Sequence, residues 1–493
     1  LYYLGGGAYL QIDAEITAKA VEPYIPVTVI NRPPAGGGDL YQDENRLAAG
    51  KTVWFNADGT ALYRLPAQEL DETPLVITVY GEEKTEGTDF TVDRAEGTVT
   101  FESAPAQLDP PQNNGVVITY YKSDATVQGS ILNCRYAEVF GGKNDVCVVV
   151  GGNEAQKNAY FWSGSNLTSD PSYFPFDYYN FAGNSDEWIT GFGRQQSFLV
   201  ILKERSVGKA EFGLTEIEGK NYAQLLYSPI NSKIGCDVPN TVQLVDNNLV
   251  FANTYGGVYM LAGTSSANEN NVMHLSRNVD GSSLKGLLYD MKNSNRFSSM
   301  DSQMRYWLIA GTHAYVWDYG ISSRVSSEDT LSWFYLENIQ GRFLAQSGDR
   351  IYFADEQGRL GKFADRCEDF GEAIPKEYEC AVLNFGTYRV LKDVERVTIT
   401  SECTPGSEIE IEYKSDYGTR KDQTPIRAYS WSLCPRNLIR RVLKVDPYSK
   451  VSVRLPRSRH IRHFGLRLSN RKLRSDMSLS GIQVYYKLRG EDR

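Results

Sequence analysis

The sequence predicts an all-β protein: a β-propeller of about six blades, with one small β-sandwich inserted near its start and another at its C-terminal end. Two features of the composition favour strands. Aromatic residues make up 12% of the chain, including 32 tyrosines, and 43 glycines are available for tight turns. Aromatic and β-branched side chains suit a pleated surface, and glycine serves turns that other residues avoid. The third observation is an internal repeat of short apolar strands.

The repeat has a period close to that of one propeller blade. Each unit is an apolar strand, a turn and a second strand, and successive units begin 45 to 57 residues apart. A blade cannot bury its faces alone, so blades stack around an axis; a hairpin at 1–13 adds a sixth unit. A stack of unrelated hairpins is the alternative. The five pairs are 146–150 with 159–162, 198–202 with 206–209, 249–252 with 257–260, 306–309 with 313–317, and 351–354 with 358–362.

Two stretches break the period and define the domains. We assign the propeller to 1–49 and 124–378, with one helix at 282–291. Between these parts, 50–123 alternates apolar and polar residues in short runs separated by turn residues, which predicts an inserted β-sandwich. The remaining residues, 379–493, are predicted to form the C-terminal β-sandwich, because apolar and acidic residues alternate almost perfectly from Glu408 to Tyr413.

The charge is distributed unevenly along the chain. The 493 residues carry a formal net charge of −9, which argues against a protein whose whole surface grips nucleic acid. Residues 435–493 hold sixteen Lys and Arg against four Asp and Glu, a local charge of +12, so the remainder carries −21. No apolar run approaches the roughly 18 residues of a membrane-spanning helix. The basic C-terminal stretch is therefore a candidate docking surface.

Motifs for catalysis are weak. The four histidines, the absence of a Gly-x-Ser-x-Gly motif and carboxylate pairs that are merely adjacent, such as Asp43 with Glu44, do not define an active site. Adjacent residues of a strand point to opposite faces, so such pairs do not converge on a substrate. No Cys-x-x-Cys pair is present for zinc, and the expectation is a protein with no enzymatic activity, no cofactor and no metal. The histidines are His274, His313, His460 and His463; the cysteines are Cys134, Cys147, Cys236, Cys367, Cys380, Cys403 and Cys434.

Arginines dominate the basic stretch and are interleaved with apolar residues. A loop of closely spaced arginines cannot present every side chain on one strand face. We therefore expect a solvated surface that docks on an acidic neighbouring protein, and direct contact with DNA is the alternative. The predicted docking residues are Arg454, Arg457, Arg459, Arg462, Arg467 and Arg471.

Two segments of the repeat region resemble a known family. Asp170-Pro171-Ser172-Tyr173-Phe174-Pro175, with the strands at 188–192 and 199–206 that follow it, is one. Ile234-Gly235-Cys236 leading to 248–252 and 256–259 is the other. Both are similar to β-propeller virion proteins of tailed bacteriophages, a group that includes tail-nozzle, packaged-DNA stabilisation and tail accessory proteins. The similarity covers roughly 134–363 and identifies no catalytic residue.

The resemblance implies a structural role in the virion tail, in a protein assembled in the host cytoplasm. It implies a homo-oligomeric ring, with six copies suggested, that forms part of the DNA ejection channel, with DNA passing transiently. The ring would contact neighbouring tail, adaptor or portal-side proteins, and family members usually carry a segment ahead of the first blade. The alternative is a tail-tip protein that binds a receptor or carbohydrate, and a propeller glycoside hydrolase ranks third.

Overall fold

The computed structural model confirms the all-β class, with 52% of the chain in strands and 5% in helices. It separates into two compact units, Leu1–Phe363 and Ala364–Arg493, which are described in turn. The structure describes residues 2–108, 112–141, 147–164, 170–217, 220–263, 271–282, 284–322, 331–339, 341–364, 367–402, 407–421, 426–427, 449–454 and 458–491.

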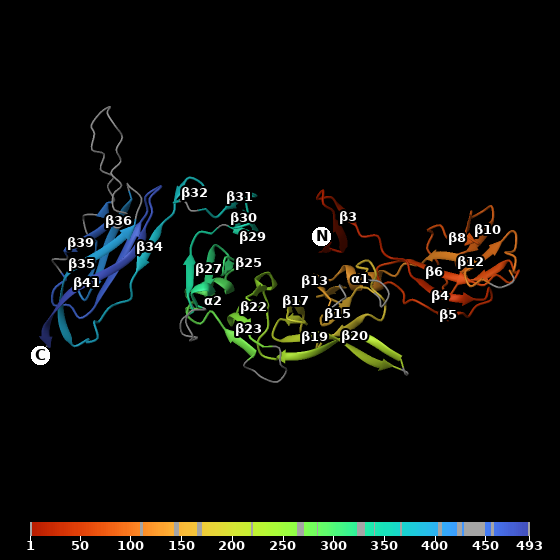
Figure 1. Cartoon of the computed structure of the whole chain (residues 1–493), viewed down its shortest axis with the longest axis horizontal. Coiled ribbons are helices and arrows are strands. Elements are labelled where there is room, and N and C mark those ends of the chain that lie inside the picture. The colour runs from red at the N-terminus through yellow and green to blue at the C-terminus, as the bar shows by residue number, and fades with distance from the viewer. Residues whose placement is uncertain are drawn as a thin grey trace, which may run out of the picture. The chain divides into compact units, whose positions relative to one another are not determined.

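Four consecutive antiparallel sheets of four strands form the main part of the first unit (Figure 1). The first strand of each sheet contacts the first strand of the next, so the sheets succeed one another along the chain. Their strands are β13 (Tyr136–Phe140), β14 (Cys147–Gly151), β15 (Ala159–Trp162) and β16 (Tyr179–Phe181); β17 (Ile189–Gln195), β18 (Phe198–Lys203), β19 (Val207–Ile217) and β20 (Lys220–Asn231); β21 (Gln243–Val245), β22 (Asn248–Asn253), β23 (Gly257–Leu261) and β24 (Val272–His274); β25 (Phe297–Ser302), β26 (Arg305–Ala310), β27 (His313–Asp318) and β28 (Trp333–Leu336).

A three-stranded sheet stands at each end of this series. β1 contacts β13 and β29 contacts β25, so both sheets continue the same succession of first strands. The pairing of β1 with β2 confirms the hairpin predicted at the start of the chain. The strands are β1 (Tyr2–Gly5), β2 (Ala8–Ile12) and β3 (Ala18–Ala20), and β29 (Gly341–Ser347), β30 (Arg350–Asp355) and β31 (Leu360–Lys362).

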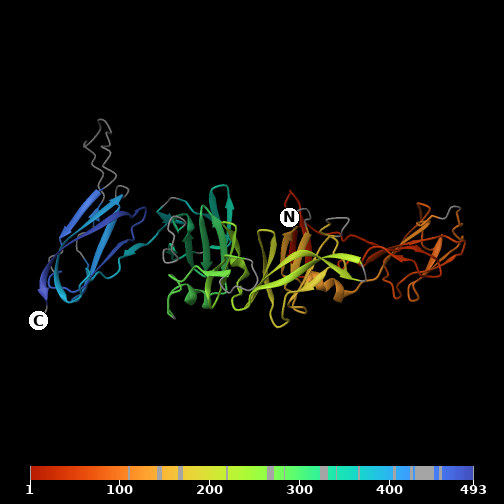
Figure 2. The ribbon, with the colours of Figure 1, turned by 60° about the horizontal axis from the view of Figure 1, so that its bottom comes forward.

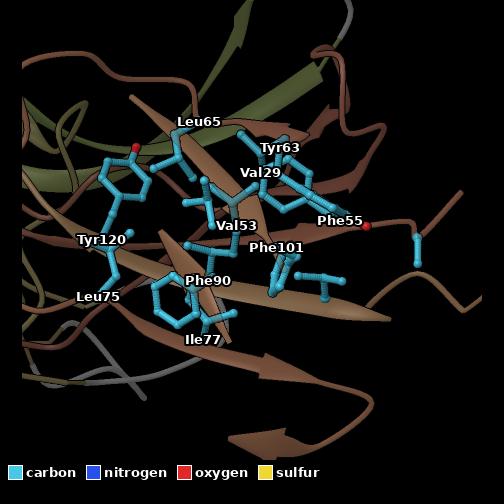
Figure 3. Close-up of a cluster of buried hydrophobic side chains, with 14 of the residues drawn as sticks. Val29, Val53, Phe55, Tyr63, Leu65, Leu75, Ile77, Phe90, Phe101 and Tyr120 are labelled. Carbon is cyan, nitrogen blue, oxygen red and sulfur yellow. The ribbon is translucent and has the colours of Figure 1, made fainter. Parts of the chain in front are cut away.

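A two-sheet module lies between β3 and the first four-stranded sheet. A six-stranded sheet, ordered β5-β4-β6-β12-β8-β9, and a three-stranded sheet, ordered β10-β11-β7, enclose one apolar core (Figure 3). β4 pairs in parallel with β6, which brings residues from before position 50 into this module. The strands are β4 (Val27–Arg32), β5 (Asp39–Leu40), β6 (Gly50–Phe55), β7 (Leu62–Arg64), β8 (Val76–Val79), β9 (Glu82–Lys84), β10 (Phe90–Asp93), β11 (Thr98–Phe101) and β12 (Val116–Tyr121).

The helices are short and differ from the prediction. The segment predicted as a helix at 282–291 is helical only from Leu287, in α2 (Leu287–Lys292). Gly286 precedes it with φ at 109°, a conformation that a helix interior does not adopt. A helix that was not predicted, α1 (Ala125–Leu132), begins at the N-cap Asp124, which accepts hydrogen bonds from Thr126 N and Val127 N. The other two are α3 (Tyr319–Ser322) and the 3-10 turn η1 (Pro239–Thr241).

The main part of the second unit is two facing sheets around a single core, and a short hairpin of β32 with β33 precedes them in the sequence (Figure 2). One sheet has the order β34-β40-β36-β37, with β38 also pairing β36, and the other has the order β39-β35-β41. The alternation predicted from 408–413 is confirmed, since Ile409, Ile411 and Tyr413 are buried and the glutamates between them are half-buried. The strands are β32 (Glu368–Asp369), β33 (Glu372–Ala373), β34 (Lys376–Glu379), β35 (Val390–Glu402), β36 (Glu408–Ser415), β37 (Gly418–Lys421), β38 (Ile426–Arg427), β39 (Ser449–Arg454), β40 (Phe464–Asn470) and β41 (Ser478–Glu491).

Candidate functional site

The predicted docking arginines occupy different places around β40. Arg459 and Arg462 precede the strand, Arg467 lies on it, and Arg471 follows it. At about 3.3 Å per residue, seven residues separate the two ends of β40 by roughly 20 Å. The structure therefore divides these cations between two ends of one strand. Arg454 ends β39, with its side chain undescribed, and Arg457 lies outside the described residues.

Exposure and pairing distinguish these arginines further. Arg459 and Arg471 are exposed, whereas Arg462 is half-buried. Arg467 donates to Glu377, with Nη2 2.5 Å from Oε2, and its Nη1 lies 3.7 Å from Glu412 Oε2. The hydrogen bond to Glu377 raises the pKa of Arg467 above its ordinary value. Arg467 is thus engaged inside its own sheet and is a poorer docking residue than Arg459 or Arg471.

Carboxylates of neighbouring strands balance much of the basic charge in the second unit. β34 and β36 flank β40, and both bring glutamates toward its cations. Residues 364–493 hold 25 Lys and Arg against 18 Asp and Glu, a net +7, and residues 1–363 hold 27 against 43, a net −16. The charge separation predicted from the sequence is therefore smaller when it is counted over the compact units. The pairs are Lys421 with Glu410, Lys472 with Glu408, Arg474 with Glu368, Lys414 with Glu379 and Lys487 with Glu395.

A buried carboxylate on β35 contacts both the loop before β40 and the end of β41. Asp393, on β35, accepts a hydrogen bond from Arg489 Nε at 2.6 Å and another from the backbone N–H of His460 at 2.9 Å. Burial alone would raise the pKa of Asp393, but these two donors outweigh it, so the pKa lies below its ordinary value. The ionised carboxylate therefore belongs to the folded state and fixes the loop that carries Arg459.

In the first unit, one histidine lies beside a serine and an aspartate. His274 Nε2 is 2.9 Å from Asp280 Oδ2, and Ser276 Oγ is 3.3 Å from the same nitrogen. However, Ser276 is fully buried, donates to Asp280 at 2.6 Å and accepts from Val258 N at 2.8 Å. In a catalytic triad the aspartate and the serine bind opposite ring nitrogens. This arrangement is a buried polar junction and does not have the geometry of an activated nucleophile.

A second histidine has an orientation that general bases use. His313 Nδ1 lies 3.0 Å from Asp290 Oδ2 on α2, and the same carboxylate accepts a hydrogen bond from Tyr315. An aspartate bound to Nδ1 orients the ring and leaves Nε2 for a reacting group. Asp290 is nearly buried and His313 is about one-third exposed. Sequence analysis missed this pair because 23 residues separate its members.

Two further carboxyl groups, each on the first strand of a four-stranded sheet, have pKa values above their ordinary range. Burial raises the pKa of Asp301, on β25, and the charge of Asp246 adds to the effect, although Tyr319 donates to it at 3.0 Å. Burial also raises the pKa of Glu138, on β13, against the opposing charge of Arg194, whose Nε is 3.2 Å from it. Perturbed carboxyl groups are found at active sites and also in structural ion pairs. Here each has a structural partner.

A hollow on the first unit contains an ion pair. A shallow hollow of about 240 Å³ is lined by Arg296, Thr312, Arg342 and Glu356, and the Arg296–Glu356 ion pair lies within it. Among the residues that the structure describes, no group of three His, Cys, Asp or Glu side chains is placed to hold a metal ion. No helix in the described part of the chain is long and apolar enough to cross a membrane.

Comparison with known proteins gives matches to solved structures only. No family model and no curated protein matches the chain. Among the matching structures is an exo-β-1,3-galactanase from Phanerochaete chrysosporium with galactose: 9% identity, TM-score 0.24, covering 74% of this chain and 98% of that one. A Trypanosoma rangeli sialidase matches at 8% identity and TM-score 0.21, covering 72% and 91%. A Bombyx mori β-fructofuranosidase matches at 12% identity and TM-score 0.16, covering 77% and 74%.

These matches correct one expectation from the sequence. The prediction that the chain is not an enzyme is contradicted, because the solved structures to which it is similar are glycoside hydrolases and sialidases. The sequence prediction rested on the absence of local motifs, and a site assembled from distant strands leaves no such motif. At TM-scores of 0.16 to 0.24, however, the likeness transfers neither the activity nor the catalytic residues of those proteins.

Proposed function

We propose that this chain is a structural component of a bacteriophage virion tail, forming part of the channel through which DNA is ejected. The observation that carries the proposal is the separation of charge between the compact units, −16 on residues 1–363 and +7 on residues 364–493. The resemblance to propeller virion proteins gives the role, and the separation of charge is consistent with it.

The acidic unit suits a conduit because DNA must pass without binding. Each cation on a channel wall attracts phosphate and releases counterions, which favours retention of the duplex. An acidic wall repels it. On this proposal the sheets from β1–β3 to β29–β31 form a propeller of about six blades, β4 to β12 form an inserted β-sandwich, and the second unit is the C-terminal β-sandwich.

The second unit is the proposed docking element of the ring. Copies of the chain, with six suggested by the resemblance alone, would surround the DNA path and contact adaptor, portal-side or other tail proteins through the basic surface. Closed cyclic symmetry is a common solution for repeated subunits. Of the predicted docking arginines whose side chains are described, Arg459 and Arg471 are exposed and available for that contact. Their charges would mainly steer association and set its register.

An incorporation assay tests the role of this surface. Particles are assembled with the double variant Arg459→Glu, Arg471→Glu, and the amount of the chain per particle is measured by mass spectrometry. We expect a loss of at least tenfold, with an unchanged circular dichroism spectrum. The matched control reverses two exposed cations of the acidic unit, Lys19→Glu and Arg205→Glu, and should incorporate normally. Full incorporation of the first variant would reject docking through this surface.

One observation favours a second candidate function, carbohydrate or receptor binding at a tail tip. On the inserted module, Tyr41 stacks on Trp54 with ring centroids 6.4 Å apart, and Tyr41 is 52% exposed. Stacked aromatic rings with an open face are suited to sugar rings. Reproducible binding of the full chain on a glycan array, lost with Tyr41→Ala and kept with Tyr255→Ala, would support this function. Absence of binding would count against it.

A further inference from the structure

Among the described residues, the strand nearest the C-terminal end of the sequence pairs along one edge only. β41 runs for fourteen residues, and in the sheet order β39-β35-β41 it pairs only with β35. No other strand of the described residues pairs with its second edge. An edge strand of this length presents a row of backbone donors and acceptors that readily pair with another strand.

Eight residues in the middle of β41 form a regular template. The pairing with β35 passes over Ser480 and Arg489, so each of these residues is a bulge on β41. Between them, from 481 to 488, no residue of β41 is passed over, and the one further register shift is a bulge of β35 at Glu395, opposite Tyr485 and Tyr486. Bulges disturb pairing on both sides of them. The regular stretch is therefore the part of the edge best suited to a new partner.

The inward face of this stretch continues past the core. Ile482 and Val484 pack against the core of the second unit, and Tyr486 lies against Phe385 in a tilted ring contact with centroids 4.2 Å apart. Leu488 shares their face, but it is 61% exposed, and Tyr486 itself is 41% exposed. The apolar face thus extends beyond the side chains that cover it. A partner strand that brings apolar residues to this position would complete the layer.

We propose that β41 pairs antiparallel with β41 of a second copy of this chain, around a two-fold axis at Tyr485. In this register each Leu488 faces Ile482 of the other copy, and each Tyr486 faces Val484. Directly opposed side chains of an antiparallel pair lie close enough to pack. The register pairs 482–488 of each copy with 488–482 of the other, with no bulge residue of β41 among them, and it joins two three-stranded sheets into one of six strands. A two-fold contact needs only one self-complementary surface, which this strand provides.

The charges of the strand agree with this register. Lys487 binds Glu395 and Arg489 binds Asp393, so both cations already have partners on β35. In the paired strands Lys487 would face Gln483, and Arg489 would face Gly481, so no like charges are opposed. On the outer face Tyr485 would meet Tyr485 of the other copy, beside Arg396, which lies 4.2 Å from the Tyr485 ring centroid. Aromatic pairs at such positions stabilise sheets.

This inference goes beyond the proposed function. A ring in the tail requires a head-to-tail contact, and a two-fold contact does not close a ring of that kind. The dimer therefore describes the purified protein and protects its open edge outside the particle. Measurements on the purified chain can reject the dimer without affecting the proposed tail role, and measurements on particles can reject the tail role without affecting the dimer.

Solution mass and crosslinking test the proposal on the full chain. By sedimentation velocity at micromolar concentrations, we expect a mass of two copies, which falls to one copy with Leu488→Lys. The matched control is Leu473→Lys, at a leucine that is 46% exposed in the loop after β40, and it should remain dimeric. Tyr485→Cys should form a disulfide-linked dimer under mild oxidation, whereas the wild-type chain and Tyr417→Cys should not. A monomeric wild type, or a dimer that persists in Leu488→Lys and fails to crosslink through Tyr485→Cys, would overturn the proposal.

Discussion

The guanidinium of Arg467 lies 2.5 Å from the carboxylate of Glu377, although ninety residues separate them in the sequence. Arg467 is central to the basic run of the sequence, yet the fold places it between two acidic strands. The same sheet pairs Lys472 with Glu408 and Lys421 with Glu410. Much of the positive charge counted along the C-terminal stretch is therefore used inside the unit, and only part of it is available to a partner.

Removal of Arg467 should affect docking less than removal of the exposed arginines. In Arg467→Ser, two carboxylates lose a partner, but their side chains keep contact with water, so we expect only a small decrease in stability. Incorporation into particles should remain within about twofold of wild type, a difference below 1 kcal/mol. Chemical denaturation and particle mass spectrometry measure the two effects. Incorporation as poor as that of the Arg459, Arg471 double variant would show that Arg467 itself contacts the neighbour.

Acid should destabilise the second unit through Asp393. The pKa of this carboxyl is below its ordinary value in the folded state, so its stabilising contribution is present above the unfolded pKa of about 3.9 and is lost as pH falls through the folded pKa. Asp393→Asn should be less stable than wild type at pH 7 and should lose less stability between about pH 4 and pH 2. Urea unfolding at several pH values measures both. Parallel pH profiles for the two proteins would contradict the assignment.

Loss of the hydroxyl group should change the free energy of unfolding differently at two buried tyrosines. Among the described residues, the Tyr63 hydroxyl in the core of the inserted module has no hydrogen-bond partner, whereas Tyr160 donates to Leu225 O at 2.6 Å. Tyr160→Phe should lower the free energy of unfolding by about 1 kcal/mol, because it removes one of two side-chain hydrogen bonds to Leu225 O, the other coming from Asn180 Nδ2 at 3.1 Å. Tyr63→Phe should leave it unchanged or raise it. Thermal unfolding compares the two, and a larger loss for Tyr63→Phe would contradict the packing shown in Figure 3.

A buried ammonium ties two neighbouring sheets of the first unit together. Lys203, at the end of β18, donates to Ala182 O at 2.8 Å and Asn184 O at 3.0 Å, and lies 3.5 Å from Glu187. Lys203→Met should cost roughly 3 kcal/mol or more, because it leaves a largely buried carboxylate and two carbonyls without their cation. Lys209→Met is the matched control. Its ammonium lies over the ring of Phe198, so a loss of about 1 kcal/mol or less is expected. Equal losses would argue against the buried link.

Strands with local patterns could be predicted from the sequence. The alternation at 408–413 gives β36, and the apolar runs at 198–202 and 249–252 lie within β18 and β22. These succeed because an alternating or continuous apolar run has few ways to be buried. The parallel pairing of β4 with β6 was not predicted, since it depends on contacts across the inserted module rather than on either strand alone.

The candidate sites were harder to predict than the strands. The pairing of Arg467 with Glu377, and of His313 with Asp290, joins residues that become neighbours only after the sheets form. Composition supplied the sign of the charge on each half of the chain, but it could not show which cations are already bound. The same reason explains why the expectation of no enzymatic activity, drawn from missing local motifs, was not a sound inference.

The most direct test of the tail assignment is an electron-microscopy reconstruction of particles that carry this chain. Mass spectrometry of the same purified particles would establish that the chain is present. We expect density for several copies arranged as a closed ring around the tail axis, with the acidic unit lining the channel and the basic unit against the neighbouring tail protein. Absence of the chain from the particles, or its presence only at a site away from the DNA path, would overturn the tail assignment.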